Sequence, residues 1–117
     1  MSILICGGAG YIGSNINKML SEKGYDTIVF DNLVYGHREF VRWGRLIEGD
    51  LSDEEAIEEV FAHNQIEAVF HFAAYAYVGE SVTQPEKYYY NNVACTLNLL
   101  RAMRRHGCKT IIFSTHH

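Results

Sequence analysis

Three glycines near the amino terminus have the spacing of a phosphate-binding turn. Gly7, Gly10 and Gly13 follow the pattern G-x-x-G-x-x-G, between an apolar run and a segment with helical periodicity. Glycine accepts the positive φ of a tight turn, and without a Cβ it lets backbone amides approach a pyrophosphate. The first N–H groups and the dipole of a following helix favour the same anion. The pattern therefore predicts a site for the phosphates of a nucleotide.

An aspartate at the end of the next apolar run adds a second group of the same kind of site. Asp31 follows Thr27–Phe30, close to the separation of about 20 residues at which a dinucleotide-binding carboxylate occurs. A carboxylate accepts hydrogen bonds from a ribose diol and repels a 2′-phosphate, which favours NAD over NADP. A tight turn followed by a solvent-facing aspartate is the alternative interpretation.

Two more segments, Gly49–Leu51 and His71–Ala74, each follow an apolar run. Asp50 is placed to meet an adenine amino group, although such an aspartate more often begins a helix. The small residues that end the second segment let the chain pass close to a ligand. In an open parallel sheet all these segments gather at the carboxyl edge, where ligands bind.

The elements that must position these residues alternate along the chain. Short apolar runs bounded by turn residues predict strands, and apolar residues at helical spacing predict helices. Strands are expected at Ile3–Cys6, Thr27–Phe30, Arg45–Glu48, Ala68–Phe72 and Thr110–Phe113. This alternation predicts an α/β fold, a Rossmann-like doubly wound parallel sheet.

Three helices are expected between these strands. The first runs from Tyr11 to Lys23, the second opens at a capping box formed by Ser52 and Glu55, and the third begins near Pro85. The apolar residues at helical spacing are Ile12, Ile16, Met19 and Leu20 in the first helix and Tyr89, Val93, Leu97, Leu100 and Met103 in the third.

Composition and charge argue against several classes of function. With 48% hydrophobic and 21% charged residues, the 117-residue chain has the composition of one globular domain. Ten basic and fourteen acidic side chains leave a net charge of −4, which gives no broad attraction to nucleic acid or an anionic membrane. The three cysteines form no C-x-x-C pair, and the histidines lack metal-ligand spacing. We expect a cytoplasmic protein with no metal site, no nucleic-acid partner and no membrane span.

The sequence stops directly after the fifth expected strand, at His116-His117. A finished domain of this kind usually continues into another helix that covers the sheet. Residues 1–115 are therefore expected to be the N-terminal part of an NAD-binding Rossmann domain, truncated after the fifth strand. Residues 116–117 are expected to be a tag remnant or the truncation point.

Together these motifs resemble the extended short-chain dehydrogenase/reductases, and within that family the members that epimerise nucleotide sugars. The resemblance extends along essentially the whole chain but covers only the N-terminal part of a typical family member. The segments that carry it are Gly7–Ser14, Asp31–Leu33, Glu48–Leu51, His71–Ala74, Val78–Val82, Tyr88–Val93 and Ile111–Ser114.

The resemblance implies NAD as the cofactor and assigns its contacts by position. The turn amides meet the pyrophosphate, the carboxylate after the second strand holds the adenosine ribose, and the segment after the third strand flanks the adenine. The segment after the fourth strand and the start of the third helix line the dinucleotide. The expected cofactor-binding residues are Gly7, Gly10, Tyr11, Ile12, Gly13, Asp31, Asn32, Leu33, Val34, Tyr35, Gly36, Asp50, Leu51, Phe72, Ala73, Ala74, Tyr75, Ala76 and Asn91.

The implied reaction is oxidation at C4 of a UDP-hexose, such as UDP-glucose or UDP-galactose, rotation of the keto intermediate and return of the hydride to its other face. The family's Tyr-x-x-x-Lys pair is absent from this chain, and His116 stands where the catalytic serine or threonine is expected. We therefore expect no catalytic residue here and no activity from this segment alone.

A UDP-sugar and a second copy are the expected partners of the complete protein, and the segment itself is expected to self-associate through its uncovered sheet edge. Two alternatives stay open. One is another nucleotide-sugar enzyme of the family, such as a UDP-arabinose 4-epimerase, a UDP-glucuronate decarboxylase or a dTDP-glucose 4,6-dehydratase. The other is a non-enzymatic NAD-binding module.

Overall fold

Five parallel strands form the centre of the molecule in a computed structural model, which describes residues 1–7, 10–33, 37–72 and 85–113, without the side chains of 85–92. The strands are β1 (Ser2–Cys6), β2 (Asp26–Asp31), β3 (Arg45–Glu48), β4 (Ile66–His71) and β5 (Ile111–Phe113). Their order across the sheet is β3-β2-β1-β4-β5. The chain builds outward from β1 in both directions, which confirms the predicted doubly wound α/β fold.

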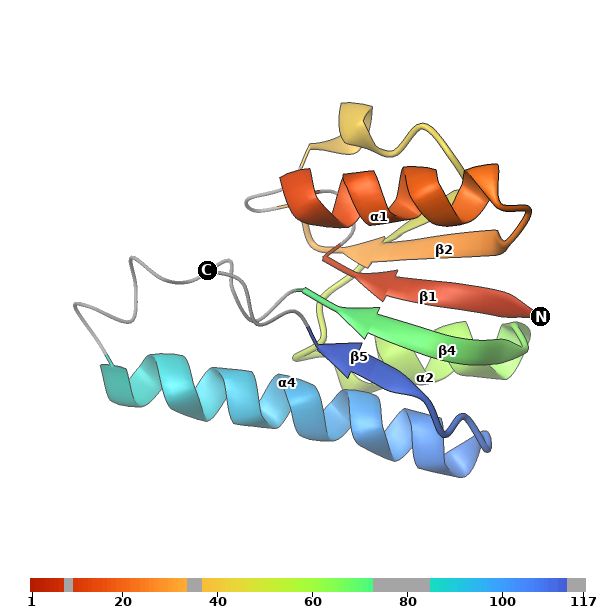
Figure 1. The fold of residues 1–117 in the computed structure, drawn as a ribbon. Helices are drawn as coiled ribbons and strands as arrows, with labels where there is room; N and C mark the ends of the chain where they lie inside the picture. The colour runs from red at the N-terminus through yellow and green to blue at the C-terminus, as the bar shows by residue number, and fades with distance from the viewer. Residues whose placement is uncertain (8–9, 34–36, 73–84, 114–117) are drawn as a thin grey trace.

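Helices cover both faces of this sheet (Figure 1). Helix α1 (Tyr11–Glu22) lies on one face, and α2 (Glu54–His63) and α4 (Pro85–Arg105) lie on the other. Within the residues described between β2 and β3, the chain forms one short helical element, the 3-10 turn η1 (Arg38–Phe40). None of the helices in the described part of the chain is long and apolar enough to cross a membrane.

The sheet divides the apolar core into two clusters. Toward α2 and α4, β1 contributes Leu4 and Cys6, which belong to a cluster with apolar residues of both helices. Toward α1, Ile3 and Ile5 belong to a second cluster with Leu20. Because helices cover both faces, β1 is buried along its whole length. The continuous apolar run that predicted this strand is typical of such a position.

The buried face of α1 differs from the predicted apolar spacing. Gly13, Asn17 and Leu20 are buried, whereas Ile12 and Met19 are 37% and 45% exposed. A polar side chain, that of Asn17, therefore occupies a core position of this helix.

Of the apolar stripe predicted for α4, Met103 packs in the core as predicted, but the other members with described side chains do not. Val93, Leu97 and Leu100 are 58%, 45% and 39% exposed, and Tyr89 lies outside the described side chains. Two apolar stripes run side by side along this helix, and periodicity alone does not show which of them meets the sheet. Among the described side chains of α4, those that pack in the core are Cys95, Leu99, Ala102 and Met103.

The predicted capping box at Ser52 is wrong by one residue. Asp53 is the N-cap of α2, and its Oδ1 accepts the backbone N–H groups of Glu55 at 3.1 Å and Ala56 at 3.3 Å. The N–H of Ser52 donates instead to Oδ1 of Asp50 at 2.9 Å. Because this bond holds Ser52 in a turn, the helix begins one residue later, and an aspartate caps it as well as a serine would.

Candidate dinucleotide-binding site

The carboxyl ends of the strands meet at one edge of the sheet, where the predicted ligand contacts lie. Cys6 pairs in register with Phe30 on one side and with His71 on the other, and Asp31 pairs with Glu48. Figure 1 shows the arrowheads of β1, β2, β4 and β5 pointing toward this edge. The segments that leave β1, β2, β3 and β4 therefore start side by side, as the sequence predicted.

The described residues at the two ends of the turn between β1 and α1, Gly7 and Gly10, have backbone features that suit a phosphate. Gly7 has a φ of 82°, which a residue with a Cβ rarely adopts, and its N–H donates to the carbonyl of Phe30 at 2.9 Å. The helix N-cap is Gly10, which makes no side-chain cap bond, and the first turn contains no acidic residue. The N–H groups of Tyr11 and Ile12 lie at the positive end of the helix dipole, in a turn without a carboxylate that would compete with an anion.

The end of β2 is a second ordered turn. Asp31 is only 9% exposed, and its Oδ1 accepts the N–H of Leu33 at 2.8 Å. Leu33 has a φ of 63°, in the left-handed region that residues other than glycine seldom adopt. The short bond to the carboxylate holds this backbone, so the position of the Asp31 carboxyl and the direction of the following chain are fixed together.

Asp31, Asn32 and Asp50, which we call the acidic corner, form one hydrogen-bonded group across β2 and β3. The amide nitrogen of Asn32 donates to Oδ2 of Asp50 at 3.2 Å, and the N–H of Gly49 donates to the carbonyl of Asp31 at 3.0 Å. Partial burial opposes ionisation of Asp50, but the hydrogen bonds from Ser52 and Asn32 outweigh it and lower the pKa of its carboxyl below the usual value. The corner therefore presents an ionised carboxylate at the edge.

The end of β4 closes the site beneath α4. His71 is 1% exposed, and its Nε2 lies 3.4 Å from the hydroxyl of Thr96. Burial lowers the pKa of His71 to about 4, so the imidazole is neutral at physiological pH. The N–H of Phe72 donates to the carbonyl of Cys6 at 2.8 Å, which carries the chain past the end of β1. Both residues are therefore held by contacts within the protein.

The described part of the chain brings most of the predicted contacts to this edge. Leu51 is buried in the core rather than open, and its carbonyl accepts a hydrogen bond from the side chain of Asn98 on α4. Asn91 lies in the N-terminal half of α4, and its side chain is not among those described. Val34, Tyr35, Gly36, Ala73, Ala74, Tyr75 and Ala76 lie outside the described residues.

Metal and thiol chemistry have no support at this edge. Among the described residues, no group of three histidine, cysteine or acidic side chains is placed to hold a metal ion. Burial, together with the charge of Asp31, raises the pKa of the Cys6 thiol well above its usual value. That thiol is therefore kept protonated in the core, where it packs as an apolar residue.

Sequence reasoning missed two residues that hold the loops of the site. The side-chain amide of Asn17 donates to the carbonyl of Trp43 at 2.9 Å, and that of Asn98 donates to the carbonyl of Leu51 at 2.8 Å. A signal was present for Asn17, because it stands between Gly13 and Leu20 on a face that helical spacing places in the core. Asn98 gave no comparable signal.

A glycine turn after the strand where the sheet order reverses, with a carboxylate at the end of the neighbouring strand, is the arrangement of a nucleotide-binding Rossmann domain. Comparison with known sequences agrees with this class. The sequence profile of the NAD dependent epimerase/dehydratase family matches residues 3–117. The chain belongs to this family.

Individual relatives are similar over nearly the whole chain. A UDP-glucose 4-epimerase of Rhizobium leguminosarum bv. trifolii is 49% identical over 114 residues, which are 97% of this chain and 35% of the relative. A probable UDP-arabinose 4-epimerase 3 of Oryza sativa subsp. japonica is 43% identical over 97% of this chain and 30% of the relative. A crystal structure of UDP-glucose 4-epimerase from Brucella ovis in complex with NAD matches with a TM-score of 0.89 at 48% identity, over 96% of this chain and 34% of that one. The chain thus spans about a third of the length of these relatives.

Proposed function

We propose that this chain binds NAD and forms the cofactor-binding part of an enzyme that epimerises a UDP-hexose at C4. The observation that carries the proposal is the juxtaposition, at one sheet edge, of the positive-φ turn at Gly7, the N-terminus of α1 and the carboxylate of Asp31. The first two suit a pyrophosphate and the third suits a ribose diol. These are the adjoining parts of one dinucleotide.

The residues present suit NAD in a specific orientation. The N–H groups of Tyr11 and Ile12 would bind the pyrophosphate, and Asp31 with Asn32 would bind the adenosine ribose. Asp50 and the neighbouring Leu51 would flank the adenine, while Phe72 and the segments 34–36 and 73–76 would line the rest, with Asn91 contacting the cofactor from α4. NAD, when bound, accepts a hydride from the sugar and returns it. The protein's part is to hold the cofactor in register with the sugar.

The UDP-hexose is the substrate class that the relatives favour. The relative of Rhizobium leguminosarum is a UDP-glucose 4-epimerase, and this chain has no Tyr-x-x-x-Lys pair of its own. The sugar chemistry is therefore assigned to the protein as a whole, and this chain alone is proposed to be inactive. A UDP-pentose is the second candidate substrate, because the rice relative is a probable UDP-arabinose 4-epimerase.

A second copy of the protein is the proposed partner. The exposed apolar residues of α4, which are Val93, Leu97 and Leu100, suit the interface of a homodimer.

Calorimetric titration with NAD and NADP tests the cofactor assignment. We expect binding of NAD to exceed that of NADP, because the Asp31 carboxylate repels a 2′-phosphate. Asp31→Ala should weaken NAD binding about tenfold through the loss of hydrogen bonds to a charged acceptor, and it should reduce the preference for NAD. Asp53→Ala is the control: it removes the cap of α2 and a similar charge, and it should leave NAD affinity unchanged.

Two results would overturn the proposal. The first is NADP binding as tight as NAD binding to the unaltered protein, and the second is an Asp31→Ala variant that binds NAD as well as Asp53→Ala does. A coding sequence that continues past Thr115 into a Tyr-x-x-x-Lys pair would favour the enzyme, and one that stops there would favour a non-enzymatic NAD-binding module.

A further inference from the structure

The strand that supplies the adenine side of the site has the least support in the sheet. β3 is an edge strand of four residues, and of the described strands it pairs only with β2. Its two central residues are only partly buried and its end residues are exposed. Yet β3 leads directly into Gly49 and Asp50, which bond to Asp31 and Asn32 in the acidic corner. Something must hold this strand in place for the corner to keep its shape.

One side-chain amide holds the chain just before β3. Asn17 is fully buried on α1, and its Nδ2 donates to the carbonyl of Trp43 at 2.9 Å. Its Oδ1 has no hydrogen-bond partner among the described residues. An apolar side chain at this core position would avoid that orphaned atom, so the bond to Trp43 is what the amide supplies there.

A second side-chain amide holds the chain just after β3. Asn98 lies on α4, and its Nδ2 donates to the carbonyl of Leu51 at 2.8 Å. Helices α1 and α4 lie on opposite faces of the sheet (Figure 1). The two amides therefore reach β3 from both faces, one at each end of the strand, and together they fix the carbonyls that bracket residues 44–50.

We propose that Asn17 and Asn98 are positioning residues for the adenosine half of the cofactor: they clamp the two ends of β3 and thereby place Asp50 against Asp31 and Asn32. This inference rests on the proposed function, because it assumes that the acidic corner receives adenosine. It differs from a general stabilising role in one respect. A clamp on β3 fixes the position of the acidic corner. Loss of the clamp therefore weakens ligand binding, whereas loss of a bond that only stabilises the fold lowers the melting temperature and leaves ligand affinity unchanged.

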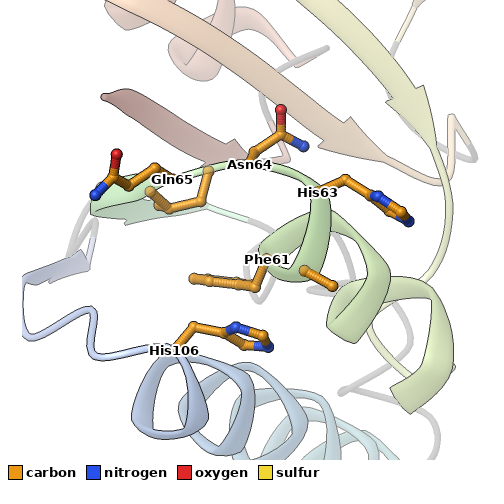
Figure 2. A pocket seen from close by; sticks show the side chains of 7 residues that line it. Phe61, His63, Asn64, Gln65 and His106 are labelled. Atoms are coloured by element: carbon orange, nitrogen blue, oxygen red, sulfur yellow. The ribbon is translucent and has the colours of Figure 1, made fainter.

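The chain offers a matched control at the opposite edge of the sheet. Asn64 makes the same kind of bond, with its Nδ2 donating to the carbonyl of Val60 at 3.0 Å in a partly buried setting. Figure 2 shows it beside a cavity of about 340 Å³ that is also lined by Phe61 and His106. This cavity lies between the C-terminal ends of α2 and α4, away from the carboxyl ends of the strands. Loss of the Asn64 bond therefore affects stability without touching the corner.

The test compares Asn17→Leu, Asn98→Leu and Asn64→Leu in the purified protein. Calorimetry with NAD and with AMP reports on the adenosine site, and hydrogen exchange of the amides of residues 45–50 without ligand reports on β3. We expect each clamp variant to bind both ligands about fivefold more weakly, the loss that one hydrogen bond supports, and to exchange faster at β3. Asn64→Leu should lower only the melting temperature.

Each outcome supports or contradicts the positioning role of Asn17 and Asn98. If the clamp variants bind NAD and AMP as Asn64→Leu does, and β3 exchanges at the unaltered rate, the inference is wrong. If a leucine variant does not fold, the corresponding alanine variant, which leaves room for water at the carbonyl, takes its place in the same comparison. If the unaltered protein binds neither ligand, the proposed function fails, while exchange at β3 still shows whether the two amides hold the strand.

Discussion

The two outer flanks of the sheet are joined to its centre in very different ways. Between β4 and β5 the chain forms α4, a helix of 21 residues that buries Leu99, Ala102 and Met103 against the sheet. In the described part of the β2–β3 connection, residues 32–33 and 37–44, the chain forms η1, a 3-10 turn of three residues, none of them buried. Parallel neighbours usually need a helical crossover, and among the described residues the β4–β5 connection has an α-helix whereas the β2–β3 connection has a 3-10 turn.

The flank without an α-helix depends on individual contacts instead of apolar area. Arg38 pairs with Glu48 at 2.6 Å, and the Lys18 ammonium lies 5.9 Å from the centre of the Trp43 ring, but exposed contacts of this kind stabilise little. Two stronger contacts hold the chain at the start of β3: the hydrogen bond from Asn17 to the carbonyl of Trp43, and the close packing of Gly44 against Thr27 of β2. The proposed adenosine site therefore lies on the flank where single residues, and not a packed helix, set the geometry.

Gly44→Ala should lower the free energy of unfolding more than any other substitution considered for the two flanks. Gly44 has a φ of 73°, and an added Cβ would overlap the hydroxyl and the carbonyl of Thr27 on β2. We expect a loss of about 4 kcal/mol in unfolding free energy, which combines left-handed strain with overpacking. Chemical denaturation measures it.

Gly107→Ala is the control on the other flank. Gly107 has nearly the same φ, 74°, but a Cβ there would meet no atom within 4 Å. The cost should be about 1 kcal/mol, that of the backbone conformation alone. Equal losses for the two variants would mean that β3 can shift to make room, and that its contact with Thr27 does not fix the strand.

Leu99→Ala tests the helix-supported flank, with the neighbouring Leu100→Ala as its control. Leu99 is fully buried and Leu100 is 39% exposed. The first change should cost about 3 kcal/mol through lost burial and a cavity, and the second about 0.5 kcal/mol. Thermal or chemical unfolding gives both values. If Leu100→Ala were the costlier variant, the face of α4 that packs on the sheet would be the one the sequence predicted.

The two flanks also show which features can be predicted from local sequence and which depend on contacts between distant residues. The strands and the glycine turn were predictable because apolar runs and turn residues are local signals. The adjacent residues Ser52 and Asp53 are both good helix caps, so only the turn made by Asp50 decides between them. The bonds of Asn17 and Asn98 span 26 and 47 positions of sequence, and no local pattern indicates a contact of that range.

The buried imidazole of His71 should make the helix-supported flank sensitive to acid. Its pKa, lowered by burial, is about 4 in the folded protein, against the usual value of 6.5 that applies in the unfolded chain. Between these values the unfolded chain binds a proton that the folded protein does not, so stability is highest above pH 6.5 and falls as the pH drops toward 4. We expect a loss of about 2 kcal/mol between about pH 7 and about pH 4.5, measured by denaturation at each pH.

A His71→Gln variant separates this effect from the acidic groups of the molecule. Glutamine has no proton to bind in this range, so the variant should lose little stability over the same interval, whatever its stability at neutral pH. The lowered pKa values of Asp50 and Glu58 act in a lower range, because a carboxylate stabilised by hydrogen bonds loses its contribution only as the pH falls through its folded pKa. An unchanged acid slope in His71→Gln over this interval would show that His71 is not the group responsible, and the imidazole would then not be the source of the acid sensitivity of the helix-supported flank.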